Sequence, residues 1–416
     1  DQIKGTVAAG FESVGQLFEH QMRTMAEQNA QLCVYHRGEK VVDLWASAIG
    51  DADFSADSLV NVFSSGKSLE AIAIGSLVSK GLLGYDDKIT QHWPEFSANG
   101  KEGVTVADLM RHEAGLANFD TSIDMEDLFT ENIKQNAVGR IIEGHAPTYT
   151  TSGVKREYHA LTRGWIANEV FRRVDPAGRT IGEFMREEIS EPLGADVVIG
   201  VSEREMARIS PVHTLGFGYQ LLQGLLPRFL GRRIVHNIFQ ILGRLLRIVP
   251  SVIRSRRTGA PPPLAGRSSM GFFNEPDFAK GETPSANASC SARGLAKLGA
   301  MMSAGGRLGG DRRQRLVRAG VALGRGRLGA ARRRTPSRPG ALGLRALGRA
   351  RRGRPTPHRL EGGGERARFD LPHAAQRAAA VAPSGRLTLC TPRAIGSAIG
   401  PPPEHDPDDT ASDRQA

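Results

Sequence analysis

The chain has 416 residues, of which 40% are hydrophobic, and it carries a formal net charge of +11. This length is enough for one large domain or two ordinary ones with a buried core. Cys33, Cys290 and Cys390 are odd in number and far apart, so they indicate neither a disulfide framework nor a zinc site. Much of the positive charge lies near the C-terminal end, so no specific nucleic-acid partner is indicated. The chain opens at Asp1 without an apolar leader, and the localisation, cytoplasmic or organellar, stays open.

The first part of the chain predicts a helix and then a β-hairpin. Apolar residues recur at three- and four-residue spacing from Gly10 to Gln28, as on an amphipathic helix. Two runs typical of strands follow, Gln31–His36 and Lys40–Trp45, and a glycine stands in the short turn between them. We therefore expect these two strands to pair in a tight hairpin.

The next feature is a Ser-x-x-Lys motif, formed by Ser64 and Lys67, at the start of an apolar helical run that ends near Gly81. Positions i and i+3 share a helix face, so the Lys67 amine can reach the Ser64 oxygen. A desolvated amine can be neutral and accept the hydroxyl proton, which makes Ser64 a nucleophile. Alternatively, Ser64 caps the helix and Lys67 is solvated, since so short a motif often arises by chance.

A loop with a histidine follows a predicted helix over Thr105–Met110. His112 and Glu113 suggest a zinc-protease motif, but His-Glu-x-x-His needs a histidine where Leu116 stands. A structural histidine that holds the loop is therefore favoured for His112 over a chemical role.

Tyr158 precedes two predicted helices, Ile166–Val174 and Arg179–Glu188. The default interpretation of a tyrosine is a half-buried ring with a hydrogen-bonded hydroxyl. A partnership with Ser64 and Lys67 would give Tyr158 a chemical role.

Residues 215–257 differ in character, because arginines are interleaved with apolar residues. The charge-free run Ile234–Gly243 is shorter than the roughly 20 residues that a transmembrane helix needs. A basic amphipathic segment can lie on an anionic membrane surface or cover a groove of its own domain, and both interpretations stay open. A proline-rich loop at 261–263 and a helix over Ala292–Met302 follow.

After about Gly305 the sequence is dominated by Arg, Gly, Ala and Pro and contains no Lys, Asn, Tyr or Trp. One interpretation of residues 306–416 is a disordered basic tail that binds polyanions. The other is an out-of-frame translation of a GC-rich coding sequence, and the abrupt onset favours it.

These motifs, taken in order, resemble the serine β-lactamase-like family, which includes class C β-lactamases, penicillin-binding proteins, esterases and animal β-lactamase-domain proteins. The resemblance covers about residues 5–305. It rests on six stretches: Val34–Trp45, Phe63–Lys67, Gly81–Asp87, Leu109–Leu116, Tyr158–Trp165 and Pro284–Asn287.

The resemblance implies an α/β (α+β) sandwich, in which an antiparallel sheet is flanked by helices and a helical subdomain is inserted after the Ser64 helix. The sheet would pair Gln31–Trp45 with C-terminal strands. In the implied mechanism Ser64 forms an acyl-enzyme, Lys67 helps to take its proton, and Tyr158 relays protons. The Ser64 N–H would supply half of the oxyanion hole, and His112 would be a substrate-binding or structural residue.

Asn287 lies in the last of these stretches and would likewise bind substrate or support the site.

Two departures from the family pattern stand out. Ala160 replaces the asparagine of the usual Tyr-x-Asn motif, which favours the esterase or peptidase-like branch of the family over β-lactam recognition. The family's Lys-x-Gly or His-x-Gly strand has no clear counterpart, because His358–Leu360 and His373–Ala375 lack the glycine.

We therefore expect a serine hydrolase that acts on a small-molecule ester or amide without a cofactor or metal. The alternative is a catalytically inactive scaffold of the same fold that contacts a membrane or a protein partner through residues 215–257. The oligomeric state stays open.

Overall fold

A computed structural model describes residues 3–149, 155–246, 261–267 and 270–306, together with two short strands at 378–381 and 387–390. Both histidine stretches that were compared with the family's last motif lie outside the described residues, as does most of 306–416. The two interpretations of that segment therefore stay predictions.

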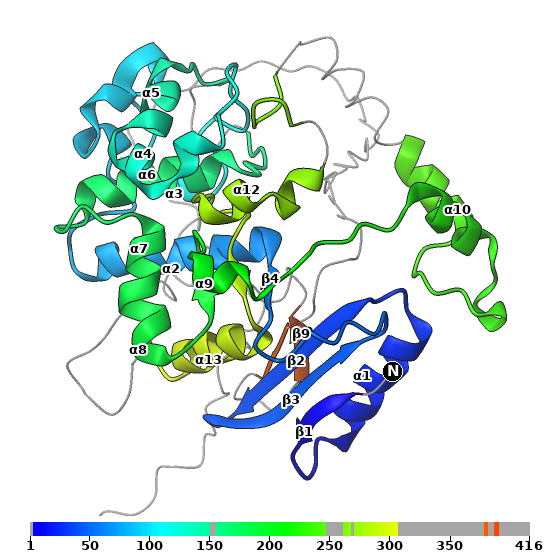
Figure 1. The fold of residues 1–416 in the computed structure, drawn as a ribbon. Coiled ribbons are helices and arrows are strands. Elements are labelled where there is room, and N and C mark those ends of the chain that lie inside the picture. Colours follow the sequence, from blue (N-terminus) through cyan, green and yellow to red (C-terminus); the bar gives the residue numbers. More distant parts are fainter. Residues whose placement is uncertain are drawn as a thin grey trace, which may run out of the picture.

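The strands fall into three groups. β1, β3 and β2 form one antiparallel sheet in that order, β5, β7, β4 and β6 form a second, and β8 pairs with β9 (Figure 1). The strands are β1 Lys4–Val7, β2 Asn29–His36, β3 Glu39–Ser47, β4 Leu59–Asn61, β5 Val197–Val198, β6 Ile209–Ser210, β7 Ser289–Cys290, β8 Ala378–Val381 and β9 Leu387–Cys390.

The α-helices are short apart from four of twelve residues or more. They are α1 Glu12–Thr24, α2 Gly66–Ser79, α3 Val106–Met110, α4 Thr130–Lys134, α5 Ala137–Gly144, α6 Thr162–Val174, α7 Ile181–Met185, α8 Glu191–Leu193, α9 Glu203–Met206, α10 Phe217–Leu225, α12 Pro276–Lys280 and α13 Ala292–Ser303. A further helical stretch covers 238–246. The predicted helix over Arg179–Glu188 is instead α7 followed by a π-helical turn, Arg186–Ser190.

The predicted hairpin is confirmed as β2 and β3. Arg37 and Gly38 form its turn with φ values of 52° and 86°, the left-handed conformation that a two-residue hairpin turn requires. Both faces of β2 are covered. Successive residues of a strand point to opposite sides, so neighbouring residues of β2 contact different helices. Leu32 packs with α1 on one face, and Cys33 packs with Ala296 of α13 on the other.

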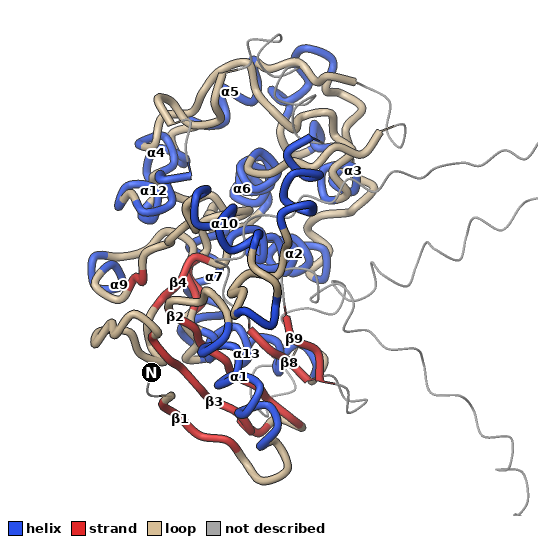
Figure 2. Tube along the Cα trace, turned by 90° about the vertical axis from the view of Figure 1, so that its right-hand side faces the viewer, coloured by secondary structure: helices blue, strands red, loops and turns tan. Residues whose placement is uncertain are grey.

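The C-terminal hairpin of β8 and β9 lies beside β2 and α13 (Figure 2). It remains a two-stranded sheet of its own and does not extend the sheet of β1 to β3. The expected sandwich of a sheet between helices is present. The expected pairing of the early hairpin with C-terminal strands is wrong, because β8 lies beside β2 without joining its sheet.

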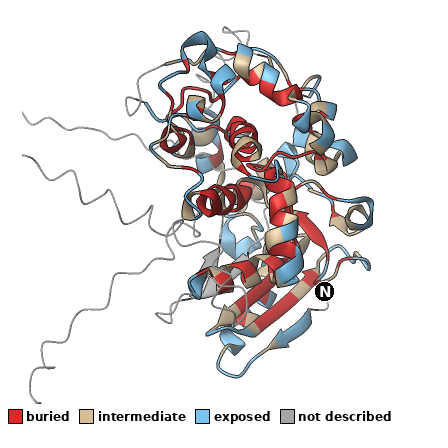
Figure 3. Ribbon diagram, turned by 90° about the vertical axis from the view of Figure 1, so that its left-hand side faces the viewer, coloured by how far each residue is buried: buried red, intermediate tan, exposed pale blue. Residues whose placement is uncertain are grey.

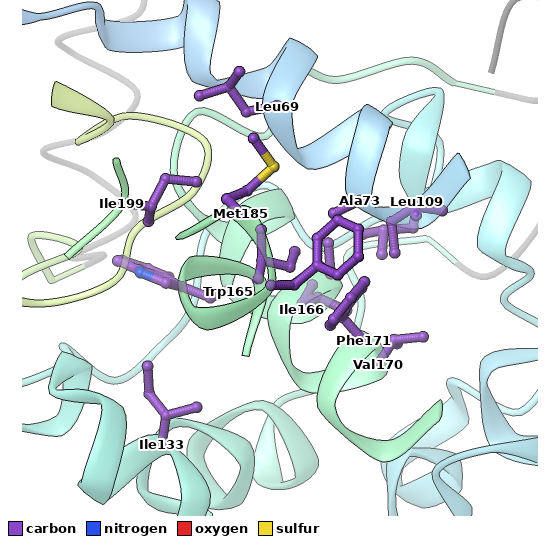
Figure 4. Packing of buried hydrophobic residues seen from close by; sticks show 14 of the residues in the cluster. Leu69, Ala73, Leu109, Ile133, Trp165, Ile166, Val170, Phe171, Met185 and Ile199 are labelled. Atoms are coloured by element: carbon purple, nitrogen blue, oxygen red, sulfur yellow. The ribbon is translucent and has the colours of Figure 1, made fainter. Parts of the chain in front are cut away.

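A mainly helical subdomain follows α2, as expected, and contains the largest hydrophobic cluster. Buried residues concentrate in the helices at the centre of the molecule and on the strands (Figure 3). Figure 4 shows Leu69 and Ala73 of α2 in this cluster with Trp165 and Ile166 of α6 and Met185 of α7. The core therefore fixes α2 against α6, the two helices whose N-terminal ends carry the site. None of the described helices is both long and apolar enough to cross a membrane.

Candidate active site

Ser64 lies in a sharp 3-10 turn, Phe63–Ser65, between β4 and α2. Phe63 has a φ of 47°, a conformation that costs free energy for a residue with a side chain. Its N–H donates to Asn61 Oδ1 at 2.7 Å, and its ring packs edge-on against Phe273 at 4.8 Å between centroids. These contacts hold the turn that presents Ser64 at the N-terminal end of α2, where backbone N–H groups favour negative charge.

The structure brings Ser64, Lys67 and Tyr158 together. The Tyr158 hydroxyl donates a hydrogen bond to Ser64 Oγ at 2.7 Å, and Lys67 Nζ lies 4.8 Å from the centroid of the Tyr158 ring. Lys67 Nζ donates to the carbonyl oxygens of Ala160 at 2.7 Å and Ser285 at 3.1 Å. In this structure two carbonyl groups hold the amine, and the Tyr158 hydroxyl lies next to Ser64 Oγ.

Burial lowers the pKa of Lys67 from 10.5 to about 7. The nearby Glu70 carboxylate opposes this shift, and the Arg163 guanidinium adds to it. A neutral amine has two N–H bonds, and the two carbonyl oxygens can accept both, so the lone pair stays available for a proton. Lys67 is thus placed to act as a base near neutral pH.

A buried ion pair lies directly behind Lys67. Arg163 Nε donates to Glu70 Oε1 at 2.7 Å, and Ser285 Oγ donates to Glu70 Oε2 at 2.7 Å. Arg163 Nη2 also donates to the Lys67 carbonyl at 3.1 Å. The pair therefore joins α2, α6 and the loop that carries Ser285 beneath the candidate nucleophile.

Sequence reasoning did not single out Glu70, Arg163 or Ser285. The signal was present as two opposite charges in helices that are otherwise apolar over several sides. A charge in such a helix needs a partner, because burying it unpaired costs several kcal/mol.

His112 lies beneath the loop that carries Tyr158. It has a φ of 64°, its Nδ1 accepts the backbone N–H of His159 at 3.0 Å, and its ring lies 4.9 Å from that of Tyr158. His159 is fully buried, and its Nε2 accepts the Leu116 N–H at 3.1 Å. Burial and then the charge of Arg163 lower the pKa of His112 to about 3, so its ring is neutral. These contacts support the structural role favoured for His112 over a chemical one.

Asn287 is buried, and its side chain bonds to backbone groups of α12 and of the loop that follows this helix. Its Nδ2 donates to the carbonyl oxygens of Phe278 at 2.7 Å and Gly281 at 2.6 Å, and its Oδ1 accepts the Thr283 N–H at 2.9 Å. Asn287 therefore shapes the loop that brings Ser285 to Lys67 and does not face the nucleophile's hydroxyl.

A pocket opens beside the nucleophile turn. Its lining residues come from the start of β2, from β4 and the nucleophile turn, and from the segment after β6: Ala26, Glu27, Gln28, Asn29, Asn61, Phe63, Ser210, Pro211, Val212, His213 and Leu215. Across the part of the chain that the structure describes, no group of three or more His, Cys, Asp or Glu residues could hold a metal ion.

The family model described as Beta-lactamase matches residues 14–353, most of the chain. The chain belongs to the beta-lactamase family. This membership confirms the resemblance that the ordered motifs indicated.

Within the beta-lactamase family, the chain is 36% identical over 168 residues to the esterase/beta-lactamase LipL of Mycobacterium tuberculosis. This match spans 40% of the present chain and 37% of LipL, well under half of the relative's length.

Solved structures agree on the fold. A penicillin-binding protein homolog from Caulobacter crescentus has a TM-score of 0.57 at 29% identity, over 78% of this chain and 77% of the homolog. A family VIII carboxylesterase has a TM-score of 0.59 at 26% identity, over 78% and 76%.

Proposed function

We propose that this chain is a serine hydrolase that cleaves an ester or amide through an acyl-enzyme on Ser64. The observation that carries the proposal is the 2.7 Å hydrogen bond between Tyr158 Oη and Ser64 Oγ, next to a buried Lys67 with a pKa of about 7. A nucleophile, a proton acceptor and a group that tunes the acceptor are the parts that acyl transfer by a hydroxyl needs.

In the proton route that we propose, Tyr158 passes protons between Ser64 and Lys67. Lys67 in its neutral form takes the phenolic proton, and the resulting ammonium, 4.8 Å from the Tyr158 ring, stabilises the phenolate. The phenolate accepts the Ser64 proton across 2.7 Å as Oγ bonds to the substrate carbonyl carbon. Tyr158 then donates that proton to the leaving alkoxide or amine, and water releases the acyl group by the same route in reverse.

The substrate class follows from position 160. Ala160 has no side-chain amide to bind a β-lactam, and its backbone carbonyl is already occupied by Lys67 Nζ. LipL is described as an esterase/beta-lactamase, and one structural neighbour is a carboxylesterase. We therefore propose a small-molecule ester as the preferred substrate over a β-lactam.

Turnover of p-nitrophenyl butyrate tests this function, with a chromogenic cephalosporin as the competing substrate. Ser64→Ala should lower kcat at least about 10³-fold, as loss of a catalytic nucleophile does in other serine hydrolases. Ser65→Ala is the matched control, because the neighbouring hydroxyl makes no side-chain capping bond, and it should keep ester turnover.

Equal turnover by wild type and Ser64→Ala would contradict the proposed nucleophile. A folded wild-type protein without turnover of either substrate would favour the inactive scaffold.

A further inference from the structure

The segment over residues 215–246, here called the arm, forms a small helical hairpin. Helix α10 and the stretch 238–246 meet at Gly224, where an added Cβ would lie 2.8 Å from Ile241 Cδ1. The arm is tied to the end of α1, because the Ala26 N–H donates to the Arg233 carbonyl and Arg233 Nη2 donates to the Met25 carbonyl, each at 2.9 Å. Figure 1 shows α10 set apart from the body of the molecule.

The arm exposes large apolar side chains to an unusual degree. Phe229 and Phe239 are 85% and 80% exposed, whereas Ile241 packs inside the hairpin. The other exposed apolar residues of the arm are Phe217, Tyr219, Leu222, Leu225, Leu230, Val235, Leu242, Leu245 and Leu246. So many exposed apolar side chains on one short segment mark an interaction surface.

The arm carries charge of one sign. Residues 215–246 contain four arginines, Arg228, Arg232, Arg233 and Arg244, and no Asp, Glu or Lys. A second copy of the chain would bring the same positive charge against it, and the segment after Gly305 is also rich in arginine. The complementary partner is therefore apolar inside and negative at its surface, which describes an anionic lipid bilayer.

We propose that the arm is a membrane-docking surface that inserts its apolar side chains into an anionic lipid bilayer. Phe229 and Phe239 enter the boundary between headgroups and acyl chains, while Arg228 beside Phe229 binds phosphate and carboxylate groups. Leu215, at the root of the arm, lines the same pocket as Phe63, the residue before Ser64. Docking would thus bring the pocket mouth close to the lipid surface.

Flotation of the full chain with lipid vesicles tests this docking without reference to catalysis. Vesicles of phosphatidylcholine with 30% phosphatidylserine should carry the protein, while pure phosphatidylcholine vesicles should carry much less, since each arginine near an anionic surface contributes roughly fivefold. The double variant Phe229→Ser/Phe239→Ser should bind the anionic vesicles at least about tenfold more weakly.

Leu82→Ser is the matched control, because Leu82 is an exposed apolar residue at the end of α2, outside the arm, and its loss should leave flotation unchanged. Unchanged thermal unfolding of the double variant would show that the arm residues act at the surface. Flotation that is absent, or equal for wild type and the double variant, would overturn the proposal. A wild-type dimer that the double variant dissociates would also overturn it, because a second copy would then cover the arm.

Discussion

At the scale of single residues, the proposed chemistry depends on how the protein controls the charge of Lys67. Two carbonyl oxygens accept its N–H bonds, and burial lowers its pKa to about 7. An unpaired Glu70 carboxylate would favour the charged form of Lys67. Arg163 offsets this effect, because its guanidinium forms an ion pair with Glu70 at 2.7 Å. The buried pair therefore supports the loop and α6 while leaving the amine able to release its proton near neutral pH.

The pH dependence of ester turnover tests the charge of Lys67. In the proposed mechanism the neutral amine is the active form, so kcat/KM should rise about tenfold per pH unit up to about pH 7 and then level off. Initial rates with p-nitrophenyl butyrate between pH 5 and 9 measure this profile. Lys67→Arg should abolish the turnover, since a guanidinium stays charged over this range. A profile that is flat from pH 5 to 9 in the wild type would contradict the assigned base.

At the scale of elements, two glycines let the loop over Pro284 and Ser285 approach the helix starts. A Cβ on Gly66 of α2 would lie 2.5 Å from the Pro284 carbonyl oxygen, and a Cβ on Gly164 of α6 would lie 2.5 Å from the Ser285 backbone nitrogen. Both distances are shorter than any non-bonded contact permits. The glycine of the Ser-x-Gly-Lys stretch thus allows the close packing that brings the Ser285 carbonyl to Lys67.

Alanine substitutions test this packing. Gly66→Ala and Gly164→Ala should each lower the free energy of unfolding by about 1–3 kcal/mol, because the backbone must move to admit the methyl group. Urea unfolding measures the change. Gly144→Ala at the end of α5 is the control, since nothing lies within 4 Å of its Cβ position, and it should be neutral or slightly stabilising. Equal effects at all three positions would contradict the close approach.

At the scale of the whole molecule, the buried amine links the stability of the fold to pH. The pKa of Lys67 is 10.5 in its ordinary state and about 7 in the folded protein, so between these values the unfolded chain binds more protons. The free energy of unfolding therefore falls as pH is lowered from 10.5 to 7, and it rises again as pH is raised over this range.

A comparison with Lys67→Met isolates this contribution. The free energy of unfolding of the wild type, relative to that of Lys67→Met, should rise by about 1.4 kcal/mol per pH unit between about pH 7 and 10. Chemical denaturation of both proteins at several pH values measures the difference. A difference that is independent of pH would show that the folded amine keeps its ordinary pKa.

Much of this arrangement could be predicted from local patterns. Hydrophobic periodicity and turn glycines located α1, the β2–β3 hairpin and α2, and the order of the motifs indicated that Ser64 and Tyr158 share a site. The pairing of Glu70 with Arg163, 93 residues away along the chain, could not be predicted, because it depends on how α2 and α6 pack. The two carbonyl groups that accept hydrogen bonds from Lys67 could not be predicted either. Every residue has a backbone carbonyl, so the sequence does not show which of them will bond to the amine.

Labelling by a fluorescent fluorophosphonate tests the central claim most directly, because the reagent forms a covalent bond with an activated serine. Peptide mapping should find the label on Ser64, and Ser64→Ala should remove it. Tyr158→Phe should slow labelling by about 10²–10⁴-fold, since it deletes the hydroxyl that takes the Ser64 proton at 2.7 Å. A folded protein that is unlabelled, or labelled at another residue, would contradict the assignment of Ser64 as the nucleophile.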